Sequence, residues 1–158
     1  MTSLPDHDLV IERLTDVSAA AIWRVWTTPA LVTQWFAPAP WSAPRAEIEL
    51  RPGGLYSVTL RSPEGEEFAG PGCVLEVVEN TRFVWTSAMG PGFRPLPVTA
   101  EDLPFTAVFT LDSTPEGTLY RATVIHPDPE TCARHAAMGF YEGWGQVTDQ
   151  AIALARTL

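Results

Sequence analysis

The chain has 158 residues, with ten arginines, no lysine and 19 acidic residues, which give a formal net charge of −9. The arginines are scattered singly among acids. This pattern excludes nucleic-acid binding and docking on an anionic membrane surface, because both need a basic patch. No run of 18 apolar residues is present, so no membrane-spanning helix is expected. The length and the apolar content of 46 % predict one globular domain over residues 1–158.

The first residues, MTSLPDHD, are polar and acidic, which is not the pattern of a signal peptide. We therefore expect a cytoplasmic protein in which Cys73 and Cys132 are reduced thiols. No pair of histidines or cysteines has zinc-site spacing, and the glycine-rich segments lack the phosphate-loop patterns. The sequence accordingly predicts neither a metal nor a cofactor.

Hydrophobic periodicity and capping signals predict the elements in chain order. A short β-branched run predicts a strand over 9–14. Asp16 or Ser18 can cap a following helix over 19–26, and Thr28 before Pro29 starts a second helix that ends near Trp35. After a proline-rich loop, alternation and turn signals predict strands over 45–50, 55–61, 67–78, 82–88, 105–111 and 119–126, with a second loop over 90–104.

A single long helix is predicted at the C-terminal end of the chain. Asp128, Pro129 and Glu130 form a strong helix start, and no proline follows. The helix is expected to run from Pro129 to about Arg156. The chain therefore has one strand, two short helices, six hairpin-linked strands and a long helix. This order predicts an α+β layer fold, with an antiparallel sheet whose apolar face the long helix covers.

His126 is the most informative titratable residue. It ends the last predicted strand on the apolar parity of Tyr120, Ala122 and Val124, which directs it toward the space between sheet and helix. Two interpretations stay open. A lone histidine on an apolar face can be a core residue with satisfied hydrogen bonds, or it can be a polar contact for a ligand.

Glycines and tryptophans leave the same two interpretations open, namely core packing and ligand binding. Gly139, Gly143 and Gly145 lie within the predicted long helix, where each costs roughly 1 kcal/mol relative to alanine. They allow either close helix–sheet packing or room for a ligand beside the helix. Trp35 and Trp41 flank the proline-rich loop and suit either a pocket or the core, as does Phe36. Helical spacing favours the core for Trp23 and Trp26.

Several motifs together resemble one superfamily. The segment AIWRVWTTP at 21–29, followed by Trp35-Phe36 and Pro38, is similar to the opening pattern of the START-like helix-grip (SRPBCC) superfamily. LRPGG at 50–54 and GFYEGW at 139–144 match further parts of the pattern. Within the superfamily, the chain resembles the activator of heat-shock-protein ATPase homologue and polyketide-cyclase-like branch. The resemblance runs from about Leu9 to Leu154.

The resemblance implies a helix-grip fold, in which a curved antiparallel sheet of about six or seven strands wraps a long C-terminal helix, with two short helices after the first strand. It also implies a cavity between sheet and helix. His126 and Tyr141 would supply polar contacts there. The apolar wall and the ends of the cavity would be formed by Trp35, Phe36, Trp41, Val58, Leu60, Leu75, Phe83, Trp85, Phe105, Phe109, Val124, Phe140 and Trp144.

Three functions are compatible with this reading. The favoured one is a non-enzymatic protein that binds a small hydrophobic or aromatic molecule in the cavity. The second is a cyclase- or dehydratase-like enzyme in which His126 is the general acid or base and Tyr141 its partner. The third, implied by the family name alone, is a co-chaperone-like activator of a heat-shock-protein ATPase. A homodimer is compatible with the sequence, and the charge of −9 is read as surface solubility.

Overall fold

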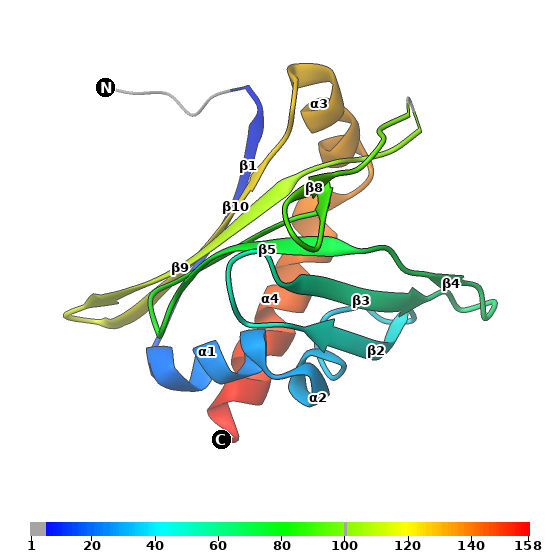
Figure 1. The fold of residues 1–158 in the computed structure, drawn as a ribbon. Helices are drawn as coiled ribbons and strands as arrows, with labels where there is room; N and C mark the ends of the chain where they lie inside the picture. Colours follow the sequence, from blue (N-terminus) through cyan, green and yellow to red (C-terminus); the bar gives the residue numbers. More distant parts are fainter. Residues whose placement is uncertain (1–5, 100) are drawn as a thin grey trace.

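The computed structural model describes residues 6–99 and 101–158, which form a curled antiparallel sheet around helices (Figure 1). The helices are α1 (Ala19–Thr27), α2 (Pro29–Val32), α3 (Pro129–Ala137) and α4 (Phe140–Arg156). The strands are β1 (Asp8–Thr15), β2 (Ser42–Ile48), β3 (Leu55–Arg61), β4 (Glu67–Phe68), β5 (Gly72–Val78), β6 (Arg82–Thr86), β7 (Met89–Gly90), β8 (Arg94–Pro95), β9 (Thr106–Thr114) and β10 (Gly117–Ile125).

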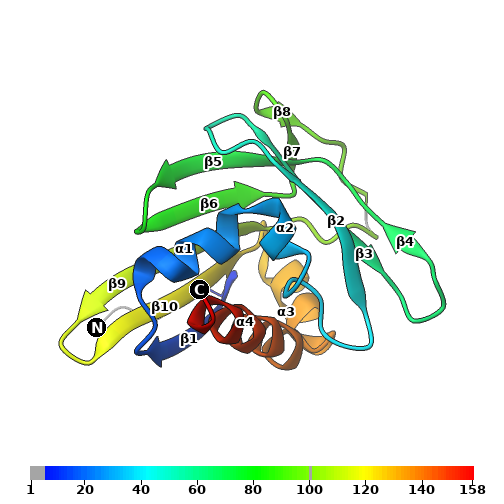
Figure 2. The same cartoon turned by 90° about the horizontal axis from the view of Figure 1, so that it is seen from below.

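The main sheet has the strand order β1-β10-β9-β6-β5-β3-β2, and β4 pairs with β3. Figure 2 shows it as an arch with α1 and α4 inside the curve. Register shifts between Ser42 and Arg45 and between Val74 and Glu76 mark β-bulges, which bend a strand and increase its twist. The predicted α+β helix-grip class is confirmed. No helix in the described part of the chain is long and apolar enough to cross a membrane.

Capping residues start the helices where the sequence predicts. The Ser18 hydroxyl accepts a hydrogen bond from the Ala21 amide at 3.2 Å, and the Asp128 carboxylate accepts one from the Thr131 amide at 2.7 Å. Each bond satisfies an amide of the first helical turn that has no partner within the helix. Pro29 occupies the first turn of α2, as expected.

The predicted long C-terminal helix is wrong in one respect, because the structure divides it into α3 and α4. The break falls at Met138 and Gly139, where Gly139 has φ of +93°. A left-handed residue cannot continue a right-handed helix, and glycine adopts this conformation without steric cost. The chain therefore changes direction here, and α3 is free to pack against β1.

Other boundaries also differ from the sequence prediction. The expected strand 67–78 is split into β4 and β5 around Gly70-Pro71, and the expected loop 90–104 contains the β7–β8 hairpin. Helix α2 ends at Val32, and turns continue the chain to Phe36. Strand β2 begins at Ser42 and includes Pro44, which an edge strand tolerates because its outer amides need no partner.

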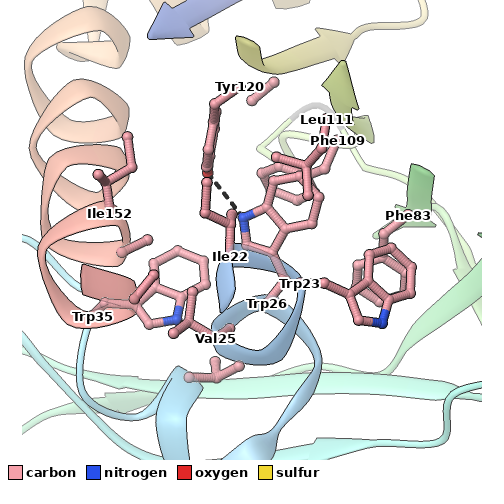
Figure 3. Close-up of a cluster of buried hydrophobic side chains, with 14 of the residues drawn as sticks. Ile22, Trp23, Val25, Trp26, Trp35, Phe83, Phe109, Leu111, Tyr120 and Ile152 are labelled. Carbon is pink, nitrogen blue, oxygen red and sulfur yellow. Dashed lines mark hydrogen bonds between the residues drawn. The ribbon is translucent and has the colours of Figure 1, made fainter. Parts of the chain in front are cut away.

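The main core lies between α1, α4 and the concave face of the sheet (Figure 3). Trp26 is 1 % exposed, and its ring centroid lies 4.9 Å from that of Phe109 and 5.1 Å from that of Tyr120. Its indole Nε1 donates a hydrogen bond to the Tyr120 hydroxyl at 3.2 Å. The predicted core role of Trp23 and Trp26 is confirmed by their burial.

Replacing Tyr120 with phenylalanine tests the contribution of the Trp26–Tyr120 hydrogen bond to stability. Tyr120→Phe leaves the buried Trp26 N–H without its acceptor, so we expect the free energy of unfolding to fall by about 1–3 kcal/mol. Urea denaturation followed by tryptophan fluorescence measures the change. The control Arg156→Ala breaks an exposed ion pair with Asp16 and is expected to cost less than about 1 kcal/mol. Equal losses in the two variants would contradict the assigned role of the Trp26–Tyr120 hydrogen bond.

Candidate functional site

A cavity of about 350 Å³ lies between the sheet and α4. It reaches the surface at the junction of α3 and α4, where Met138 lines it and is 68 % exposed. Among the described residues, none that lines it carries a formal charge when His135 is neutral. The lining consists of Trp35, Phe36, Pro38, Leu60, Trp85, Phe105, Phe109, Tyr120, His135, Met138, Gly139, Phe140, Gly143, Trp144, Val147 and Thr148.

Two periodicities build this wall. On the sheet side, residues two apart share a face, which places Phe105 with Phe109 beside Trp85 of the neighbouring strand. On the helix side, positions three and four apart share a face, so Phe140 and Trp144 lie together on α4 with Gly143, Val147 and Thr148. A predominantly apolar, concave site with a few polar groups is the usual form of a small-molecule site.

The three glycines near this helix have three different roles. Gly139 provides the left-handed break. Gly145 is buried, and a Cβ there would lie 3.1 Å from the Arg13 guanidinium, so this glycine allows close packing of α4 against β1. Gly143 lines the cavity, and a Cβ there would meet no atom within 4 Å. The sequence left two interpretations open for these glycines, close packing and open space beside the helix. The structure shows open space at Gly143.

Eight residues predicted for the site line the cavity, although their role in ligand binding stays a prediction. They are Trp35, Phe36, Leu60, Trp85, Phe105, Phe109, Phe140 and Trp144. Tyr120, a cavity residue that sequence reasoning did not assign to the wall, has the inward parity noted for His126. Val147 has the helical spacing of Phe140 and Trp144, whereas the contributions of Pro38 and Met138 have no comparable sequence signal, because they depend on where loops and helix ends meet.

Other predicted wall residues lie elsewhere. Val58 lines a neighbouring cavity that shares Phe36 and Trp85 with the first. Phe83 is 1 % exposed and packs edge-on against Trp23 in the main core. Val124 belongs to a second buried cluster with Leu9, Ile11, Cys132 and Phe140. Trp41 is 38 % exposed and packs against Phe68, with ring centroids 5.9 Å apart.

The prediction for Leu75 is wrong because of a β-bulge. Val74 pairs with Trp85 and Glu76 with Val84, so Leu75 is the extra residue between these pairs. The bulge changes the alternation that the sequence suggests. Val74, fully buried, packs in the main core, and Leu75 is not among the residues that line the cavity, where it was expected.

The predicted pairing of His126 with Tyr141 is also wrong. Tyr141 is 53 % exposed and lines a shallow surface depression with Arg13 and Asp149, on a different face of α4 from the cavity. His126 is 2 % exposed, and its Nε2 atom lies 2.9 Å from Nδ1 of His135. The partner of His126 is therefore His135 of α3, which sequence reasoning did not single out.

Hydrogen bonding fixes the protons of this imidazole pair when both rings are neutral. His126 Nδ1 lies 2.7 Å from the backbone oxygen of His7, which can only accept, so Nδ1 carries the proton. His126 Nε2 must then accept from Nδ1–H of His135. The Nε2 atom of His135 is left as an acceptor, with no hydrogen-bond partner among residues 6–99 and 101–158.

The His135 ring lies among aromatic residues of the cavity. Its centroid is 5.5 Å from that of Phe105, 5.2 Å from Phe140 and 6.2 Å from Trp144. Burial, together with the nearby His126, lowers the pKa of His135 from 6.5 to about 4. At neutral pH the ring is therefore an uncharged hydrogen-bond acceptor at one end of the cavity.

A second polar group lies further along the cavity. Tyr120 is 1 % exposed, and burial raises the pKa of its phenol to about 12, so it is neutral. Its oxygen interacts with Trp26 Nε1 and with the Thr148 hydroxyl. The Tyr120 oxygen therefore has a hydrogen-bond partner within the protein, whereas His135 Nε2 has none among the described residues.

The fold and the cavity together define a helix-grip protein. Residues 16–155 match the family described as Activator of Hsp90 ATPase homolog 1-like protein. The chain belongs to this family, and the resemblance read from the sequence is confirmed. No curated protein matches the chain.

Solved structures agree with this assignment. Protein NE0264 from Nitrosomonas europaea is 38 % identical, with a TM-score of 0.90 and coverage of 96 % of each chain. A protein from Rhodobacter sphaeroides is 18 % identical, with a TM-score of 0.83 and coverage of 99 % of this chain and 97 % of the other. Protein Ms6760 from Mycobacterium smegmatis is 23 % identical, with a TM-score of 0.76 and coverage of 94 % and 90 %. The last two similarities concern the fold alone.

The lowered pKa of His135 predicts a pH-dependent stability. Between about pH 6.5 and about pH 4, the unfolded chain binds a proton at residue 135 more readily than the folded chain, so acid lowers the free energy of unfolding. His135→Asn does not titrate, and its amide can still donate to His126. On lowering the pH from 7 to 4.5, we expect wild type to lose on the order of 2 kcal/mol more than this variant in urea unfolding. Parallel pH profiles would contradict the assignment.

Proposed function

We propose that this protein binds a small hydrophobic or aromatic molecule in the cavity between the sheet and α4. The observation that carries the proposal is that the fold leaves about 350 Å³ of apolar, aromatic-lined space open to the surface at Met138. Closely packed interiors have few voids larger than a water molecule. A ligand would bury its apolar surface there and gain roughly 25 cal/mol per Å² removed from water.

Gly143 supports this proposal independently. Glycine inside a helix costs about 1 kcal/mol relative to alanine, and no neighbouring atom lies where its Cβ would be. Packing therefore does not require glycine at this position. Because Gly143 also lines the cavity, the open space beside it supports a bound molecule at this face of α4.

The chemistry of the polar groups favours binding over acid–base catalysis. A general base works best with a pKa near the operating pH, whereas burial holds the pKa of His135 near 4. The proposed acid–base pair of His126 and Tyr141 is not assembled, because Tyr141 is exposed on another face of α4. We therefore favour a binding protein whose partner is a neutral small molecule. The acidic net charge supports the absence of nucleic-acid and anionic-membrane partners.

The remaining expectations stay predictions from the sequence. These are the cytoplasmic location, the homodimer and the co-chaperone activity implied by the family name. None is needed for the proposed binding function, which depends only on residues within one chain.

Filling the cavity from Gly143 tests the proposed function. We expect wild type to bind 2-methylnaphthalene, seen as shifts of cavity-residue amides in ¹H–¹⁵N correlation spectra. Gly143→Leu is expected to weaken this binding at least about tenfold, because its side chain occupies the ligand space. Its thermal stability is expected not to fall, since leucine is the better helix former by up to about 1 kcal/mol.

The matched control is Ala153→Leu, which adds a similar side chain to an exposed position of the same helix. This variant should bind the probe as wild type does. Equal binding to Gly143→Leu and wild type would show that the probe does not occupy the cavity and would remove the proposal.

A further inference from the structure

We infer that the ligand of the cavity is a neutral aromatic or polycyclic molecule with a hydroxyl group, which donates a hydrogen bond to Nε2 of His135. This inference rests on the proposed function and specifies the chemical class of its ligand. Three observations carry it: the orientation of the imidazole pair, the satisfied state of the other polar groups, and the absence of formal charge among the described residues that line the cavity.

The orientation of His135 is set outside the cavity. The His7 carbonyl accepts two hydrogen bonds from His126, one from the backbone amide at 2.9 Å and one from Nδ1 at 2.7 Å. This double contact holds the ring of His126 at the start of β1 and obliges its Nε2 to accept. His126 is therefore a positioning residue, because it directs the acceptor nitrogen of His135 to the ligand side without touching the ligand itself.

An acceptor without a partner selects for a donor. His135 is 8 % exposed, and its ring lines the cavity. Nε2 is not among the fully buried unpaired atoms of the described residues, so water can reach it. A ligand that displaces this water without replacing its hydrogen bond loses affinity relative to one that supplies a donor to Nε2. A hydroxyl attached to an aromatic ring combines this donor with a planar apolar body, which suits a wall that contains Phe105, Phe140 and Trp144.

The other polar groups do not compete for this role. The Tyr120 oxygen already accepts a hydrogen bond from Trp26 and lies beside the Thr148 hydroxyl. The indole N–H of Trp85 has no partner in the described part of the chain, but its nitrogen is fully buried and therefore closed to a molecule in the cavity. His135 Nε2 is thus the polar atom that the ligand can satisfy without disrupting the protein.

The absence of a charged lining residue excludes anionic ligands. A carboxylate in the cavity would be desolvated with no described arginine on the wall to compensate it, and its lone pairs would face the lone pair of Nε2. Fatty acids and aromatic acids are therefore disfavoured, whereas phenols and aromatic alcohols are favoured.

Three probes of one shape test the inference. At pH 7.5, 2-naphthol provides the donor, 2-methylnaphthalene lacks it, and 2-naphthoate is anionic. We measure dissociation constants by amide-shift titration for wild type and His135→Phe. The ratio of the affinity for 2-naphthol to that for 2-methylnaphthalene is expected to be about three- to tenfold higher in wild type than in the variant. This comparison between proteins cancels the different hydrophobicity of the probes. We expect 2-naphthoate to bind most weakly to wild type.

Two further variants serve as controls. His135→Asn removes Nε2 but retains an amide donor for His126, so it gives the same comparison if His135→Phe does not fold. Val147→Ala shortens an apolar wall residue without hydrogen-bonding groups and should weaken 2-naphthol and 2-methylnaphthalene to a similar extent, leaving their ratio at the wild-type value.

The possible outcomes separate the inference from the function on which it rests. A naphthol preference that disappears at position 135 and persists in Val147→Ala supports the inference. Binding of both neutral probes with the same ratio in wild type and the His135 variants overturns it and leaves the proposed function standing. Strongest binding of 2-naphthoate also overturns it. If wild type binds none of the probes, the proposed function fails and the inference fails with it.

Discussion

The hydrogen bond between His126 and His135 is the interaction on which the site depends. It joins the end of β10 to α3, at a place where the chain has just turned through Asp128 and Pro129. On one side, the backbone of His7 holds His126. On the other, His135 presents its remaining nitrogen to an apolar cavity. The imidazole pair therefore has one acceptor nitrogen without a protein partner among the described residues, and we propose that this nitrogen determines which ligands the cavity prefers.

Much of the fold follows from patterns that are local in the sequence. Alternating apolar residues place the strands and their inward faces, and the caps at Ser18 and Asp128 start two helices where expected. Two local deviations are not visible in the periodicity. A bulge at Leu75 shifts the alternation of β5, and a left-handed Gly139 divides the C-terminal helix. Both depend on backbone geometry that tertiary packing selects, and each displaces a predicted site residue or boundary.

The polar end of the site could be predicted only in part. The parity of His126 correctly directs it inward, but its partner lies on an element that the sequence presented as the first turns of one continuous helix. A short turn after a strand folds the next helix back over the strand end, and a histidine two turns into that helix can then reach the strand's last residue. His135 has this position. The short turn between β10 and α3 is therefore the sequence feature from which its pairing with His126 could have been predicted. The position of Tyr141, by contrast, could not be predicted, because the break at Gly139 changes which residues of α4 face the cavity.

The protonation of the imidazole pair can be measured directly. The ¹⁵N chemical shifts of the histidine ring nitrogens, measured near neutral pH with and without 2-naphthol, identify which atoms carry protons. We expect a proton on Nδ1 of both His126 and His135, with Nε2 of His135 unprotonated and changed in shift when 2-naphthol binds. A proton on Nε2 of His135 in the free protein, or no response of that atom to bound naphthol, would contradict this expectation.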